Sequence, residues 1–262
     1  MFTMMKTPFA ITALLATLAL PSVSVQAQDA NDSKLDEIFN EEVVKALLDE
    51  ANPDTAFLVR LKMLRAHLNA AASAVASGES TEALKHIKHP RTEIYAEIAS
   101  TLNARGLKEF AHALDNVEAA FASGDAEAMK LALAATVAEV DRAEASIDPA
   151  SLTSAGILPD AAALLLRTAV VEYHEAFEYS KLSNLVEYHD GAYFVAEASA
   201  LLKKMETVFA ARDPVALSRL QHSLAELSRA WPPEAPPAES VLPVTKMQAL
   251  VSIIELQINK LR

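Results

Sequence analysis

The chain has 262 residues, of which 52% are hydrophobic, and its formal net charge is −12. This apolar content suits a packed globular protein and argues against a disordered chain, which lacks the hydrophobic surface needed to offset ordering entropy. The absence of cysteine excludes disulfides, thiol catalysis, cysteine-based zinc sites and thioether-linked haem. The negative charge argues against general nucleic-acid binding. Only five glycines are present, and no phosphate-binding glycine motif occurs, which argues against a nucleotide cofactor.

The first 27 residues have the pattern of a cleaved secretory signal peptide. Lys6 supplies a positive charge, residues 9–20 are apolar, and Val25-Gln26-Ala27 is a small-x-small cleavage site. The apolar stretch is too short to span a bilayer comfortably. We therefore expect residues 1–27 to be removed, and residues 28–262 to form an all-helical periplasmic domain without an integral membrane span.

Beyond residue 33, the apolar residues recur every three or four positions, which is typical of helices. Ala, Leu, Glu and Lys, which favour helix, dominate this part of the chain. A loop is expected between residues 148 and 159. In chain order, the pattern predicts helices over about 33–51, 54–77, 81–89, 90–105, 107–123, 126–147, 160–211, 214–230 and 244–261.

Glycines and prolines mark the expected helix ends. Pro90 should break the chain and open the next helix, because the residue before proline avoids the helical region. The long run over 160–211 should bend near residues 180–184 or at Gly191. We predict an all-α fold, an up-and-down antiparallel bundle of about eight or nine helices built from helical hairpins, with two packed sub-bundles as an alternative arrangement.

The first group of candidate metal ligands is His67, His86 and His89. His86 and His89 are three residues apart, so both lie on one side of a short helix. His67 precedes Gly78 by eleven residues, and His89 follows it by eleven. An antiparallel hairpin that turns at Gly78 therefore predicts that His67 and His89 converge, with His86 one turn away.

The second group lies in residues 172–190. His174 and Glu178 are spaced i,i+4, and Glu175 and Glu178 are spaced i,i+3, so one helix face could supply two ligands. His189 follows in the same segment. If this helix packs beside the hairpin of His67, the two groups would form one site.

The same residues allow metal-free interpretations. Residues 85–91 form a basic patch, which on a solvated face would attract an anion or an acidic partner. Residues 173–193 hold four of the five tyrosines and form an aromatic segment that could dock a partner. No catalytic motif is present, which argues against an enzyme.

An exported, cysteine-free, all-helical chain with scattered histidine and glutamate resembles the periplasmic helical proteins of iron acquisition, the imelysin-like group. The His-x-x-Glu motif of that group does not occur in this chain. The resemblance therefore implies a class of protein and assigns no role to any residue.

The sequence thus predicts a periplasmic helical-bundle protein that binds a transition metal ion in metal uptake, buffering or sensing. Imidazole and carboxylate donors favour iron, copper or zinc. The alternative is a metal-free interaction module that docks a partner protein through the 85–91 patch or the 173–193 segment. The candidate ligands are His67, His86, His89, His174, Glu175, Glu178 and His189.

Overall fold

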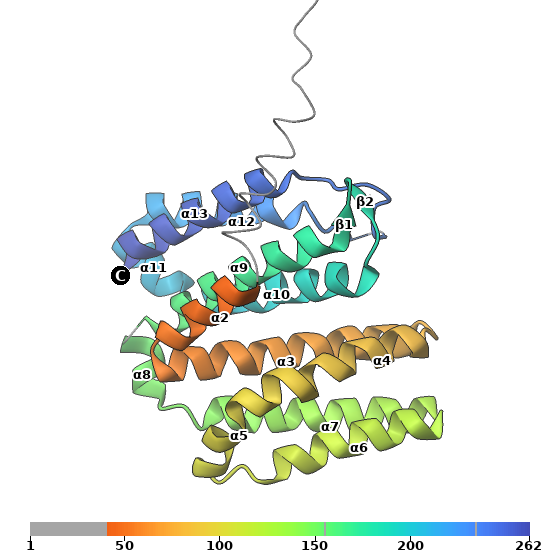
Figure 1. Cartoon of the computed structure of the whole chain (residues 1–262). Coiled ribbons are helices and arrows are strands. Elements are labelled where there is room, and N and C mark those ends of the chain that lie inside the picture. Colours follow the sequence, from red (N-terminus) through yellow and green to blue (C-terminus); the bar gives the residue numbers. More distant parts are fainter. Residues whose placement is uncertain (1–40, 155, 234) are drawn as a thin grey trace, which may run out of the picture.

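The computed structural model describes residues 41–154, 156–233 and 235–262 (Figure 1). The expected signal peptide and the start of the first expected helix lie outside these residues. Within them the protein is all-α, with twelve α-helices and a single hairpin of two-residue strands. The N-terminal part consists of α2 (Glu41–Glu50), α3 (Pro53–Ala76), α4 (Ser80–His89), the π-helical turn η1 (Pro90–Ile94), α5 (Tyr95–Ala104), α6 (Glu109–Ser123) and α7 (Ala126–Ala145).

The C-terminal part is helical as well, and its last helix has the predicted bounds. It consists of α8 (Pro149–Ser154), α9 (Ile157–Ala176), β1 (Phe177–Glu178), β2 (Lys181–Leu182), α10 (Leu185–Lys204), α11 (Glu206–Arg212), α12 (Pro214–Ser228) and α13 (Val244–Leu261). The short helix α8 lies where the sequence predicted only a loop.

The long helices are stacked in layers (Figure 1). α12 and α13 form one outer layer, α9 and α10 the next, α3 with α4 and α5 the third, and α6 with α7 the other outer layer. α9, α10, α12 and α13 form one four-helix sub-bundle, and the remaining two layers pack against it through α3. The arrangement of two packed sub-bundles is therefore the one that the chain adopts.

α3 lies at the centre of the stack, and its sequence explains why. Of its 24 residues, 15 are buried, whereas α6 in the outer layer buries only four of its 15. A helix that is apolar on nearly all sides is stable only with neighbours on all sides. Leu61, Leu64 and Leu68 share one face of this helix and are almost fully buried, and Val59 and Ala66 are fully buried on the opposite face.

The prediction for Pro90 is confirmed in part: α4 ends at His89 and Pro90 opens the next segment, but the chain does not leave the helical conformation there. The chain continues from α4 through the π-helical turn η1 into α5. Proline cannot donate an amide hydrogen, and its ring crowds the carbonyl four residues earlier. The wider π-helical turn relieves this crowding, so the helix bends without ending.

The long helical run over 160–211 is interrupted, as expected near residue 180. α9 ends at Ala176, and the hairpin of β1 and β2 turns through Tyr179 and Ser180, which have φ angles of 49° and 64°. Gly191, the other expected bend, lies inside α10. None of the described helices is both long enough and apolar enough to span a bilayer.

Candidate metal centre

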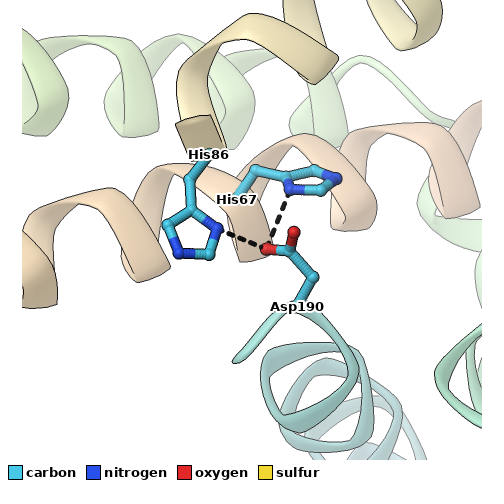
Figure 2. Close-up of side chains that lie close together, drawn as sticks. All are labelled: His67, His86 and Asp190. Carbon is cyan, nitrogen blue, oxygen red and sulfur yellow. Dashed lines mark hydrogen bonds and ion pairs between the residues drawn. The ribbon is translucent and has the colours of Figure 1, made fainter. Parts of the chain in front are cut away.

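Three side chains from three helices meet at the boundary between the α3–α4 layer and the α9–α10 layer. His67 comes from α3, His86 from α4 and Asp190 from α10 (Figure 2). Nδ1 of His86 lies 2.8 Å from Oδ1 of Asp190, and Nδ1 of His67 lies 3.0 Å from the same oxygen. Their exposed fractions are 5% for His67 and 0% for His86 and Asp190. The structure thus brings His67 and His86 of the first predicted group together with Asp190, which was not among the predicted ligands.

Gly191, the residue after Asp190, has no side chain, and this allows α10 to pack close to its neighbours. A Cβ atom at Gly191 would lie 3.0 Å from the Trp231 ring and 3.2 Å from the Ala169 carbonyl oxygen. Nε1 of Trp231 donates a hydrogen bond of 2.9 Å to the carbonyl of Tyr188, which fixes the indole against α10. Glycine therefore lets α10 approach α9 and Trp231 closely at the position next to Asp190.

The electrostatics of the centre keep Asp190 ionised. Burial acts to raise the pKa of this carboxyl, but the imidazoles of His67 and His86 outweigh it and hold the pKa below its ordinary value. A carboxylate only accepts hydrogen bonds, so Nδ1 of His86 carries the hydrogen that it donates to Asp190. The other nitrogen of that ring, Nε2, then has a free lone pair in the metal-free protein.

The donor set fits a transition metal ion. One ligand atom from each of His67, His86 and Asp190 lies within 4.8 Å of the other two. Two imidazoles and a carboxylate suit iron, copper or zinc. Two ligands at right angles with bonds of about 2.1 Å lie about 3.0 Å apart, and the observed separations of 2.8 and 3.0 Å are close to this value. An ion bound at these atoms would displace the Nδ1 protons, because metal ligands must be deprotonated.

A second acidic group lies nearby, formed by Glu172 and Glu175 of α9 and Glu187 of α10. A pocket of about 420 Å³ is lined by Glu172, Glu187 and His67, so it connects this group to the histidine centre. Its other walls come from α2, α3 and α5, and they carry both acidic and basic side chains. The pocket reaches His67 from the α2 side of the molecule, between apolar and charged side chains.

The surroundings of the Glu172 carboxyl favour its protonated form. Burial raises the pKa of the Glu172 carboxyl well above its ordinary value, and the hydrogen bond to Glu187 and the charges of Glu187, Asp190 and Glu175 raise it further. Burial also raises the pKa of Glu175, and the charges of Glu41 and Glu187 add to this effect. Two carboxylates can form a hydrogen bond only when one of them is protonated.

We expect Glu172→Gln to stabilise the metal-free protein at neutral pH, by an amount that increases with pH. A raised folded-state pKa contributes stability that is complete below the unfolded pKa and is lost as the pH rises through the folded pKa. The amide removes this loss and keeps a donor for Glu187. Urea unfolding between pH 4 and pH 8 should show a difference that grows by at most about 1.4 kcal/mol per pH unit. The exposed Glu50→Gln is the control, and a difference that does not change with pH would contradict the assignment.

The structure places the predicted ligands in different surroundings. His67 and His86 belong to the centre, and the ring centre of His189 lies 6.0 Å from that of His86. Glu175 belongs to the acidic group. The expected pairing of His174 with Glu178 on one helix face is wrong, because α9 ends at Ala176 and Glu178 lies exposed in β1. The side chain of His89 lies outside the part of the chain that the structure describes.

The two metal-free docking surfaces have the expected form only in part: Lys85, Lys88 and Tyr179 are exposed, but other members of both are buried or paired. In the 85–91 patch, His86 is fully buried, Lys85 pairs with Glu82, and Arg91 pairs with Asp115. In the 173–193 segment, Tyr173 and Tyr188 are buried and pack against Trp231. The hydroxyl of Tyr173 also accepts hydrogen bonds from the amides of Val241 and Leu242. The aromatic residues therefore belong mainly to the core.

The fold and the site together define an all-α helical-bundle protein with a buried histidine–carboxylate centre. Residues 160–262 match the iron permease-associated 4-helix bundle domain. This match covers 103 of the 262 residues, and it includes nearly all of the sub-bundle of α9, α10, α12 and α13. Asp190 lies within the matched region, whereas His67 and His86 precede it. Searches of curated proteins and of solved structures found no match.

Proposed function

We propose that this chain is a periplasmic protein that binds a transition metal ion at the centre of His67, His86 and Asp190 and serves in metal uptake, buffering or sensing. The observation that carries the proposal is the convergence of three buried donors from three helices, with separations of 2.8 and 3.0 Å. The periplasmic location follows from the expected signal peptide.

Iron is the ion that we favour. The matched domain is described as iron permease-associated, which supports a role connected with iron uptake. The donors are nitrogen and oxygen, and the carboxylates of Glu172 and Glu187 line the adjoining pocket. A site of this kind suits iron, with copper and zinc as competitors.

The burial of the centre also supports binding. A carboxylate that is fully removed from water is costly unless other groups compensate its charge. In Asp190 only Oδ1 is satisfied, because Oδ2 has no hydrogen-bond partner among the described residues. An ion at the centre would compensate the negative charge and join the two helix layers.

Metal binding is tested on the chain without residues 1–27. Dialysis against ferrous iron under anaerobic conditions, cupric ion or zinc should leave about one ion per chain and raise the melting temperature. An ion that binds only the folded state at a free concentration of 100 times Kd adds about 2.7 kcal/mol to the free energy of unfolding.

His67→Gln should weaken metal binding at least about tenfold. Even the loss of a residue that only hydrogen-bonds to a metal ligand lowers the metal affinity by about 10–100-fold. His222→Gln is the matched control, because His222 is exposed on α12. If none of the three ions binds, or if His67→Gln binds like the wild type, the assignment of this centre is wrong. Absence of all binding would favour the metal-free interaction module.

A further inference from the structure

A cavity of about 330 Å³ lies at the end of the molecule where α9 begins and α13 ends (Figure 1). Its walls come from the end of α2, the turn that follows it, the first turn of α3, and the helices α9 and α13. It therefore lies between the four-helix sub-bundle and the rest of the chain. Its volume is within the range of about 300–1,000 Å³ that is usual for small-molecule sites.

Thr55, in the first turn of α3, lines this cavity and carries a hydroxyl without a partner. The residue is 1% exposed, and its Oγ1 makes no hydrogen bond within the described part of the chain. Thr136 and Thr168 are buried as well, but their hydroxyls donate to the carbonyls four residues earlier, at 2.9 and 3.0 Å. A buried hydroxyl without a partner is uncommon and points to a ligand or an ordered water.

Two ion pairs between α9 and α13 form the polar part of the cavity wall. Nε and Nη2 of Arg167 donate to the carboxylate of Glu255 at 2.5 and 2.7 Å. Arg262 pairs with Asp160 in the same way across the two helices. All four side chains are partly exposed, so they mark the side of the cavity that faces solvent. Nη1 of Arg167 takes no part in its pair and has two hydrogens for a further acceptor.

The charges of the wall favour a ligand without net charge. The lining residues include two cationic and two anionic side chains, and each of these charges is paired. A charged ligand would add a charge that no lining side chain is left to compensate, and burying an uncompensated charge is costly. Apolar contact surface comes from Leu47, Ala51, Ala163, Leu164 and Ile258.

We propose that this cavity binds a small uncharged organic molecule that has an apolar skeleton and a hydroxyl or carbonyl oxygen at each end. One oxygen hydrogen-bonds to the hydroxyl of Thr55 at the buried end. The other accepts a hydrogen bond from Nη1 of Arg167 near the solvent. The inference does not rest on the metal centre, because the cavity and the centre share no residue.

Ligand-observed NMR on the chain without residues 1–27 tests the inference with three probes that share a four-carbon skeleton. The uncharged 1,4-butanediol should bind with a dissociation constant in the millimolar range, since so small a molecule makes few contacts. Succinate and 1,4-diaminobutane are charged at both ends, and neither should displace the bound 1,4-butanediol.

Two substitutions test the place of binding. Thr55→Val keeps the shape of the side chain and removes the hydroxyl, so it should weaken binding of 1,4-butanediol at least about fivefold. The free variant should melt at or above the wild-type temperature, because it no longer buries an unpaired hydroxyl. Ala163→Leu should abolish binding because the larger side chain fills the cavity. Thr101→Val on α5 and Ala196→Leu on α10 are the matched controls outside the cavity.

The outcomes separate this inference from the proposed function. If 1,4-butanediol does not bind, or if Thr55→Val and Ala163→Leu bind it like the wild type, the inference is overturned and the cavity serves only water. If succinate or 1,4-diaminobutane displaces the diol, the assignment of an uncharged ligand is wrong. Binding of the diol that is lost in the two variants supports the inference even if dialysis leaves no metal on the chain.

Discussion

Asp190→Asn should lower the free energy of unfolding of the metal-free protein by about 3 kcal/mol at pH 7, because it removes one partner of a buried charged network. The imidazoles of His67 and His86 both lie within 3.0 Å of Oδ1 of Asp190. An asparagine keeps one acceptor oxygen but carries no charge, and its amide adds two donors where the imidazole N–H groups need an acceptor. Urea unfolding in the presence of a chelator measures the difference.

The pH dependence gives this prediction a second test. Because the folded-state pKa of Asp190 is lowered, its carboxylate contributes stability above the unfolded pKa of about 3.9. This contribution is lost as the pH falls through the lower folded-state pKa. The gap between the wild type and Asp190→Asn should therefore close only below about pH 4. The exposed pair of Asp115 and Arg91 offers a control, since Asp115→Asn should cost less than about 1 kcal/mol. If Asp190→Asn also lowers the free energy of unfolding by less than about 1 kcal/mol, the centre contributes little to the stability of the fold.

Gly191→Leu should destabilise the protein by more than 3 kcal/mol, which is the upper end of the typical range of about 1–3 kcal/mol for overpacking a core. The first atom of the new side chain would already lie 3.0 Å from the Trp231 ring and 3.2 Å from the Ala169 carbonyl oxygen. The backbone oxygen cannot turn away as a flexible side chain can, so α9 and α10 must move apart. This displacement would also shift Asp190 away from His67 and His86.

Ala196→Leu is the matched control for this substitution. Ala196 lies on the same helix as Gly191, and it is exposed. The added side chain should remain in solvent and change the free energy of unfolding by less than about 0.5 kcal/mol. Thermal unfolding of both variants gives the comparison, and equal melting temperatures would show that the contact at Gly191 is not tight.

Local rules predicted most of the fold. Helix spacing and the positions of glycine and proline gave α3, α6, α7 and α13 to within a few residues. The hairpin after α9 was harder to predict, because its turn uses Tyr179 and Ser180 at positive φ and not glycine. That turn is the reason why the spacing of His174 and Glu178 did not produce a shared face.

The candidate site was predicted less completely, for two physical reasons. Counting residues from Gly78 estimates how far His67 and His89 lie from the turn along the two helices. It does not determine which side of α4 faces α3. The buried side of α4 contains Ala83, His86 and Ile87, while Leu84 is exposed, so His86 is the histidine that meets His67.

Asp190 was overlooked, although the sequence contains a signal for it. Asp190, Phe194, Ala198 and Leu201 recur at helical spacing and are all buried, so the acid begins an otherwise apolar stripe. A carboxylate on such a stripe must be compensated by partners. The identity of those partners depends on the packing of α10 against α3 and α4, which no local pattern specifies.

The layered stack has a consequence for how an ion would leave the proposed centre. The imidazoles of His67 and His86 belong to one layer, and the carboxylate of Asp190 belongs to the next. A small sliding movement between these layers would separate the donors without unfolding any helix. Occupancy of the proposed centre by metal would therefore be thermodynamically linked to cohesion between the two layers, so a partner protein that pulls the layers apart would also lower the affinity for the ion.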